Sequence, residues 1–281
     1  MCNEKKVFKL NLKRIKENEY TLREDEKVTD YLELMLKYIG DTDQELRDGL
    51  ILNTFVNWIE EKRYFTNEEL VNLLNTILSE DFAFYNMGQE NDDSVLKRSF
   101  SILLVNPILC VHLDKNFLDK DMIVKTKDCL IKYLNEEKDL RGYDCDKGWI
   151  HALAHVADGI DLVVNCEGIT EDTCKEVMLS IENRLCEGKE FLSAEEDERL
   201  INIIYYNIIE DKLLSDDYIC NWIQGLSRVL QINERITKFK ARTNVKNFLR
   251  SLYFRMLHIE NNEQISNSVL EIEKKLNIYI D

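Results

Sequence analysis

The stretch ELRDGLILNTFVNWIEE, residues 45–61, decides the fold class of this chain. Its apolar residues recur at intervals of three and four, which is the spacing of one face of an α-helix and not the alternation of a β-strand. The same periodicity continues along nearly the whole chain. It predicts helices over residues 30–39, 45–61, 67–80, 93–106, 121–137, 146–165, 171–185, 194–213, 217–230, 244–257 and 265–278.

The composition supports an all-α fold. The 281 residues include one proline, Pro107, and nine glycines, whereas sheet proteins need frequent turns built from these two residues. A proline inside a helix removes a backbone donor, so we expect the fourth helix to end or kink near Asn106. Short connections predict antiparallel helical hairpins, and the absence of a linker-like segment predicts a single domain over residues 26–281.

The charge of the chain limits its partners and its location. The formal net charge is −16, which repels nucleic-acid phosphates and anionic lipid, so neither nucleic acid nor membrane is an expected partner. Residues 1–25 contain the basic stretch KKVFKLNLKRIK (5–16), which we interpret as a solvated or frayed leader. No segment has the apolar length of a signal peptide or a membrane span, so a cytoplasmic protein is expected. The eight cysteines form no CxxC pair and are interpreted as core residues.

Polar residues stand within apolar helices at intervals of about 50 residues, beginning with Asp48, Arg98 and His151. This interval is close to the period of two-helix repeats of the HEAT or armadillo kind. In such stacks one helix of each hairpin lines a concave surface, where exposed polar groups bind ligands. The pattern therefore favours a curved helical repeat with a polar stripe along its concave face. A helical bundle or an α/α barrel fits the same periodicity.

The motif GWIHALAHVAD, residues 148–158, places two histidines four residues apart. On a helical wheel with 100° per residue, His151, His155 and Asp158 project within one narrow wedge. Three interpretations are open. The wedge is a solvated helix face, or a polar groove in which neutral imidazoles bond a ligand, or a site for a divalent metal such as zinc. The metalloprotease motif HExxH is absent, because Ala152 stands where its glutamate is required.

Two arginines complete the predicted site. Arg98 shares a helix face with Ser94 and Ser101, and Arg250 shares one with Lys246 and Tyr253. Each arginine either forms a structural ion pair with a carboxylate such as Asp48 or Glu60, or faces a cavity suited to an anionic ligand. Trp149 is either an apolar anchor in the core or part of the site. The candidate ligand-binding residues are Asp48, Arg98, Trp149, His151, His155, Asp158, Arg250 and Tyr253, of which His151, His155 and Asp158 are also the candidate metal ligands.

The same central residues carry a resemblance to a known family. The stretch DLRGYDCDKGWIHALAHVAD (139–158) resembles the signature of the bacterial family catalogued as domain of unknown function 2785. Residues 92–105 and 246–256 are also similar to that family, and residues 46–59 fit it more loosely. The resemblance implies an all-helical fold and brings no established activity. Pro107 departs from the pattern, since the apolar run of the fourth helix continues there in the family.

Two functions from different classes follow. The first is a cytosolic interaction module that binds a peptide, a protein or an anionic small molecule on the polar stripe. The second is a metal-dependent hydrolase, in which His151 and His155 hold a divalent ion, Asp158 completes or orients the site, and a bound water is the nucleophile.

Overall fold

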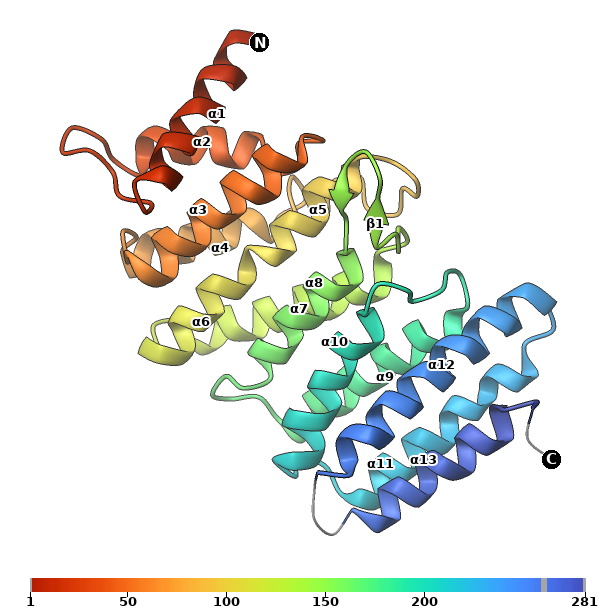
Figure 1. The fold of residues 1–281 in the computed structure, drawn as a ribbon. Helices are drawn as coiled ribbons and strands as arrows, with labels where there is room; N and C mark the ends of the chain where they lie inside the picture. Colours follow the sequence, from red (N-terminus) through yellow and green to blue (C-terminus); the bar gives the residue numbers. More distant parts are fainter. Residues whose placement is uncertain (1, 259–261, 280–281) are drawn as a thin grey trace. The chain divides into compact units, whose positions relative to one another are not determined.

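The computed structural model describes residues 2–258 and 262–279. Most of the described backbone is helical, and a two-stranded hairpin is the one sheet within the described ranges. The all-α fold predicted from the helical periodicity is therefore confirmed (Figure 1). The chain divides into two compact units, residues 1–162 and 163–281, and each is described by itself. The single domain over residues 26–281 stays a prediction.

The first unit contains helices joined by loops, with a β-hairpin near its end. Its elements are α1 (Cys2–Glu17), α2 (Thr29–Lys37), the π-helical segment η1 (Glu45–Leu52), α3 (Asn53–Val56), a second π-helical segment η2 (Asn57–Glu61), α4 (Asn67–Ile77), α5 (Ser94–Leu103), α6 (Val105–Lys115), α7 (Lys120–Glu136), β1 (Tyr143–Asp144), β2 (Gly148–Trp149) and α8 (Ala152–Val163).

The second unit is helical throughout its described part. Its elements are α9 (Glu171–Glu187), α10 (Glu196–Asn202), the π-helical segment η3 (Ile203–Glu210), α11 (Asp216–Gly225), the 3₁₀ segment η4 (Leu226–Gln231), α12 (Arg235–Met256) and α13 (Glu263–Leu276). The long helix α12 packs against α9, α10 and α13, and α11 packs against α13 (Figure 1).

The stretch 45–61 is helical as its periodicity predicts, but much of it is wound as a π-helix in the segments η1 and η2. Side-chain amides satisfy carbonyls along this wider helix. Asn53 Nδ2 donates to the carbonyls of Asp48 (3.1 Å) and Gly49 (3.2 Å), and Asn57 Nδ2 donates to the carbonyl of Asn53 (2.8 Å). Within this helix the asparagine side chains therefore act as hydrogen-bond donors to backbone carbonyls.

The basic N-terminal stretch is helical in the structure. Residues 2–17 form α1, which packs against η1, and the apolar side chains of Phe8, Leu12 and Ile15 are buried. The basic residues of α1 lie opposite acidic residues around the start of η1: Lys9 Nζ is 2.5 Å from Asp43 Oδ2, and Lys13 Nζ is 2.6 Å from Glu45 Oε1. The local positive charge is therefore complemented within the chain, and the apolar stripe holds the helix in place.

The helix containing Pro107 is interrupted where the sequence predicts a break. Leu104 separates α5 from α6, and Pro107 lies in the first turn of α6, where its missing N–H has no helical acceptor to lose. The combined stretch Ser94–Lys115 is long and apolar enough by composition to cross a membrane, and 78% of its most apolar window is buried inside the protein. Buried core helices of soluble proteins have the same character.

Candidate functional site

The segment that carries the family signature begins with a β-hairpin and not with a helix. The prediction of a helix from residue 146 is wrong for its first six residues, because α8 begins only at Ala152. Strands β1 and β2 pair antiparallel, with Tyr143 opposite Trp149. The Asp144 carboxylate closes the turn by accepting from the backbone N–H groups of Asp146 (2.9 Å) and Lys147 (3.0 Å). These hydrogen bonds, with that of Asp146 first, lower the pKa of Asp144.

Two residues with positive φ connect the hairpin to its surroundings. Gly148 has φ +77°, and an added Cβ would lie 2.2 Å from Gln44 Cδ. His151 has φ +47°, which is uncommon for a residue with a side chain. The backbone N–H groups of Ile150 (2.9 Å) and His151 (3.3 Å) both donate to the carbonyl of Gly142. This contact draws the chain back onto the hairpin and delays the start of α8, so His151 stands before the helix.

Aromatic rings extend in series from the exposed hairpin toward the core. The Tyr143 ring meets that of Trp149 edge-on at 4.9 Å between centroids, and Trp149 stacks on His151 at 4.1 Å. The His151 and His155 rings are perpendicular at 5.9 Å, and His155 meets Phe100 at 5.4 Å. Tyr143 and Trp149 are 54% and 40% exposed, whereas His155 and Phe100 are buried. The structure thus brings three predicted site residues together: Trp149, His151 and His155.

The contact with a serine hydroxyl assigns the tautomer of the buried histidine. Ser99 Oγ donates to the carbonyl of Ile150 and also lies 2.7 Å from Nδ1 of His155. Because a hydroxyl has one hydrogen, which goes to the carbonyl, Nδ1 of His155 must donate in the second contact. In a neutral His155 ring the hydrogen is therefore on Nδ1, and Nε2 is the acceptor nitrogen. Through these two hydrogen bonds, the Ser99 hydroxyl holds the His155 ring in position.

Arg98 forms a buried structural ion pair. Its side chain is 0% exposed and grips Glu137 with two parallel hydrogen bonds, Nε to Oε2 at 2.7 Å and Nη2 to Oε1 at 2.8 Å. Nη1 also donates to Ser94 Oγ (2.8 Å) and to the carbonyl of Tyr85 (3.1 Å). Burial lowers the pKa of Arg98, but the hydrogen bond and charge of Glu137 outweigh it, and the net shift is upward. Arg98 therefore forms a structural ion pair, but its partner is Glu137 and not Asp48 or Glu60.

Arg47 ties the hairpin to the core of the first unit. Its buried guanidinium donates from Nη2 to the carbonyls of Lys147 (2.6 Å) and Trp149 (3.1 Å), and from Nη1 to the carbonyl of Asp41 (2.6 Å). It also lies over the Phe100 ring, 4.6 Å from its centroid. Burial lowers the pKa of Arg47, and nearby carboxylates oppose that shift. Arg47 contacts residues about one hundred positions later in the chain and so fixes both ends of β2.

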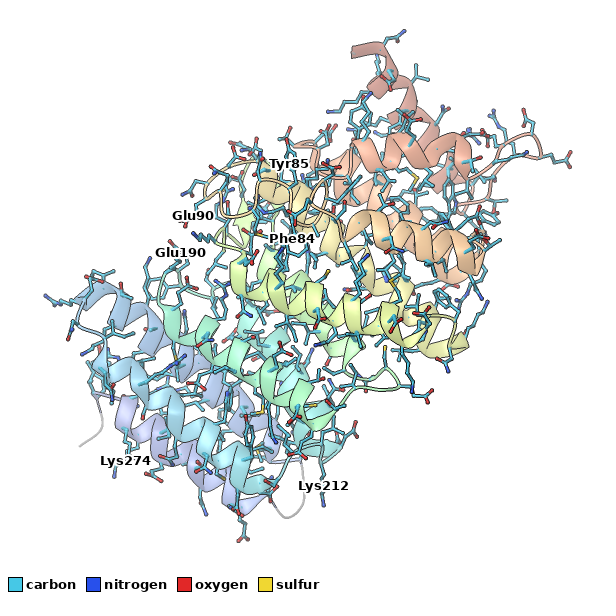
Figure 2. All side chains as sticks on the ribbon, turned by 180° about the vertical axis from the view of Figure 1, so that it is seen from behind. Phe84, Tyr85, Glu90, Glu190, Lys212 and Lys274 are labelled. Carbon is cyan, nitrogen blue, oxygen red and sulfur yellow. The ribbon has the colours of Figure 1, made fainter. Side chains whose placement is uncertain are left out.

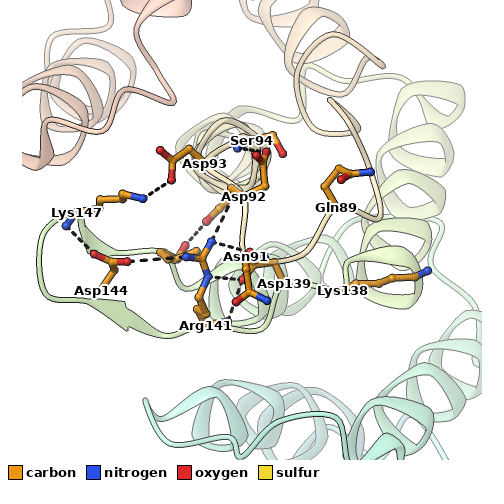
Figure 3. A network of polar contacts seen from close by, with 12 residues as sticks. Gln89, Asn91, Asp92, Asp93, Ser94, Lys138, Asp139, Arg141, Asp144 and Lys147 are labelled. Atoms are coloured by element: carbon orange, nitrogen blue, oxygen red, sulfur yellow. Dashed lines mark hydrogen bonds and ion pairs between the residues drawn. The ribbon is translucent and has the colours of Figure 1, made fainter.

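Two further ion pairs hold the outside of the hairpin (Figure 3). Arg141 grips the buried Asp139 through Nε to Oδ1 at 2.8 Å and Nη2 to Oδ2 at 2.7 Å. Lys147 Nζ lies 2.5 Å from Asp93 Oδ1, which joins the hairpin to the start of α5. The Asp139 carboxylate also accepts from the backbone N–H of Asn91 (2.9 Å). The side chains of Arg47, Arg98, Arg141 and Lys147, with their partners, thus form a frame around the exposed rings of Tyr143 and Trp149.

The remaining predicted residues of the first unit lie on separate elements. Asp48 is half-buried on η1, where burial raises the pKa of its carboxyl, and Arg47 and Lys16 oppose the shift. Asp158 is half-buried on α8. A pocket of about 570 Å³ opens beside the Asp93–Lys147 pair, and neither Arg98 nor His151 lines it. Its lining residues are Lys37, Gly40, Asp41, Thr42, Tyr85, Asn86, Asp92, Asp93, Ser94 and Lys97.

Arg250 and Tyr253 belong to α12 in the second unit. Arg250 is 46% exposed on its side chain and pairs with Glu273, with Nη2 to Oε1 at 2.7 Å. Arg250 therefore also forms an ion pair, with Glu273 and not with Asp48 or Glu60. Tyr253 is half-exposed, and its ring meets that of Phe254 at 6.0 Å.

Metal analysis tests the predicted metal site. Within residues 2–258 and 262–279, no group of three or more His, Cys, Asp or Glu side chains is placed to hold a metal ion. The predicted hydrolase requires about one equivalent of a divalent metal per chain, because zinc sites take three or four protein ligands. It also requires that His151→Ala loses the metal. Mass spectrometry of tag-free protein decides the point: metal-free protein that remains folded contradicts the hydrolase.

Sequence reasoning missed the buried residues that build the frame, namely Arg47, Ser99 as a partner of His155, and Glu137. Arg47 is adjacent to the predicted Asp48, and Glu137 lies two positions before Asp139, the first residue of the signature DLRGY. The one signal in the sequence for these residues was a charged residue within an apolar stretch. The residue that pairs with Arg98 lies 39 positions away, and the residues that Arg47 contacts lie about one hundred positions away. No local sequence pattern reveals such distant partners.

The fold and the site define an α-helical protein in which a hairpin presents aromatic rings over a frame of buried arginine contacts. The model of the family described as "Protein of unknown function (DUF2785)" matches residues 83–254, which contain α5 to α8, the hairpin and most of α12. The chain belongs to this family. No curated protein matches the chain, and no solved structure does.

Proposed function

We propose that this protein is a recognition module that binds a peptide or protein partner through the aromatic surface of its hairpin, formed by Tyr143, Trp149 and His151. One observation carries the proposal: Trp149 is 40% exposed although it stacks on His151 and pairs with Tyr143. Large aromatic side chains supply most of the binding energy at protein interfaces. An exposed tryptophan that is already held in one orientation is suited to this role.

The frame beneath the hairpin supports binding by reducing its entropic cost. Arg47 bonds the carbonyls of Lys147 and Trp149 from inside, and Lys147 pairs with Asp93 on the outside. A surface that is already ordered loses little conformational freedom when a partner docks, so more of the contact energy appears as affinity. The shallow, solvent-facing aromatic pair favours a peptide or protein over the anionic small molecule that the sequence also allowed, since small ligands need enclosed pockets.

The proposal includes the finer architecture expected from the sequence, a HEAT-like or armadillo-like series of helical hairpins. Support comes from the packing of α12 against α9, α10 and α13 in the second unit. It also keeps the expected cytoplasmic location, with neither nucleic acid nor membrane as a partner. The net charge of −16 supports these exclusions, because phosphate-rich surfaces are repelled.

Site-specific crosslinking tests the proposal. With p-benzoylphenylalanine at Tyr143, irradiation of cells that naturally contain the protein should give a discrete crosslinked partner, identified by mass spectrometry. We expect Trp149→Ala to lower the yield about tenfold or more, because truncating an interface hot spot costs about 2 kcal/mol or more. Trp149→Phe should retain most of the yield, and the same crosslinker at Tyr64 should not capture that partner. Equal yields from Trp149→Ala and the unmodified protein would contradict the proposal.

A further inference from the structure

The helix α12 differs in charge from the rest of the chain. In a protein of net charge −16, its sequence RITKFKARTNVKNFLRSLYFRM has no acidic residue. Its basic residues are Arg235, Lys238, Lys240, Arg242, Lys246, Arg250 and Arg255. Three of them pair with carboxylates of the second unit: Lys240 with Glu190 at 3.2 Å, Arg250 with Glu273 at 2.7 Å, and Arg255 with Glu198.

Five of these cations form one row, which we call the basic ridge: Arg235, Lys238, Arg242, Lys246 and Arg250. Their successive spacings of three and four place them along one side of the helix. Within the part of the chain that the structure describes, the first four form no ion pair. Burial is the largest cause that lowers the pKa of Lys246; the charges of Arg250 and Arg242 lower it further, and the charge of Glu273 opposes them.

Helix stability does not account for this row. Like charges four residues apart destabilise a helix, and cations in the first turn oppose the helix dipole. Arg235 and Lys238 occupy that first turn. The helix start is already capped by Glu234, which accepts from the backbone N–H of Ile236 at 3.0 Å and of Thr237 at 2.5 Å. These hydrogen bonds, led by those to Thr237, lower the pKa of Glu234 to about 2. The Glu234 carboxylate lies at the start of the helix, so its charge does not offset the repulsion between the cations farther along the ridge.

Exposed apolar side chains lie next to the basic ridge on the same helix. Ile236 is 57% exposed and Phe239 is 47% exposed. The Phe239 ring meets the partly exposed ring of Phe191 at 5.8 Å, which extends the apolar surface to the segment after α9. A strip of aromatic and aliphatic groups beside a row of cations is the composition of an interface that anchors apolar residues and steers acidic ones.

We propose that this face of α12 is a docking surface for an acidic peptide segment with apolar anchors, in addition to the hairpin site of the proposed function. Carboxylates of the segment lie along the basic ridge, and its apolar side chains contact Ile236 and Phe239. From Arg235 to Arg250 the ridge is about 22 Å long at 1.5 Å per residue. An extended segment of about seven residues or a helix of about fifteen spans it. A nucleic acid is less suited, because the strongly acidic remainder of the chain repels dense phosphate charge and the apolar strip would be left uncovered.

Fluorescence anisotropy with the full chain tests the proposal. The probe is a fluorescein-labelled peptide of about fifteen residues built from Glu-Glu-Leu-Phe-Glu repeats, a length chosen to span the ridge. We expect saturable binding that weakens as salt rises, since exposed charges are screened. The double variant Arg242→Glu, Lys246→Glu should weaken binding about tenfold or more, because it places like charges opposite the peptide. The matched control is Lys212→Glu, Lys274→Glu, which makes the same charge change at two exposed positions labelled in Figure 2 and should bind like the unmodified protein.

A neutral variant separates binding from folding. Arg242→Gln, Lys246→Gln removes repulsion within the ridge, so its melting temperature should be equal to or above that of the unmodified protein while its affinity falls several-fold. Loss of affinity in both ridge variants, but not in the control, supports the proposal. No binding of the peptide, equal binding by all variants, or binding of single-stranded DNA or phosphatidylserine vesicles in place of the peptide would overturn it.

Discussion

Arg98→Ala is expected to lower the free energy of unfolding by about 3–5 kcal/mol, because removing one partner of a buried ion pair leaves an uncompensated charge in the interior. Arg98 is 0% exposed, and its two parallel hydrogen bonds satisfy both carboxylate oxygens of Glu137. Without the guanidinium, the buried carboxylate must take up a proton or admit water. Urea denaturation at neutral pH, followed by circular dichroism, measures the loss.

The matched control is Arg250→Ala, which removes an arginine from an ion pair at the surface, where Nε and Nη2 both donate to one oxygen, Oε1 of Glu273. The Arg250 side chain is 46% exposed beside Glu273, and such pairs contribute about 0–1 kcal/mol. The double variant Arg98→Met, Glu137→Leu should recover much of the stability lost in Arg98→Ala, since apolar side chains of similar size remove both buried charges. Equal effects of Arg98→Ala and Arg250→Ala would show that burial does not distinguish the two pairs.

Arg47→Ala is expected to cost about 3 kcal/mol or more and to loosen the hairpin. The substitution removes the donor to the carbonyls of Asp41, Lys147 and Trp149 and leaves a cavity beside Phe100. Buried acceptors left without a donor cost about 1–3 kcal/mol each before any relaxation. Because two of these carbonyls belong to the residues around β2, hydrogen exchange of residues 143–149 should accelerate more than exchange in the second unit.

Urea denaturation and hydrogen exchange read by mass spectrometry measure these two effects. Arg63→Ala is the control, because Arg63 forms a surface pair with Asp114 at 3.2 Å and should change stability by less than about 1 kcal/mol. If exchange in the hairpin were unchanged in a folded Arg47→Ala protein, Arg47 would not be what holds the aromatic surface. In that case the crosslinking yield at Tyr143 should also be unaffected.

The sequence by itself determined the class of fold and the family. Helical periodicity such as that of residues 45–61 states which side chains share a face, and this information is local, so the helices could be predicted one by one. The break before Pro107 is equally local, because the missing N–H acts within one turn. The signature in residues 139–158 identified the family and drew attention to Trp149, His151 and His155, which the structure brings together.

Only the tertiary structure decided which polar faces turn inward. Arg98 and Arg250 have similar surroundings in the sequence, yet one is buried against Glu137 and the other lies at the surface. Helical periodicity determines which side chains share one face of a helix. It does not determine which element packs on that face, because that element comes from residues far along the chain. The hairpin shows the same limit. Residues 146–151 have helical periodicity, but the Arg47 guanidinium and the Gly142 carbonyl bind their backbone, and the summed free energy of these long-range hydrogen bonds exceeds a weak local preference for helix.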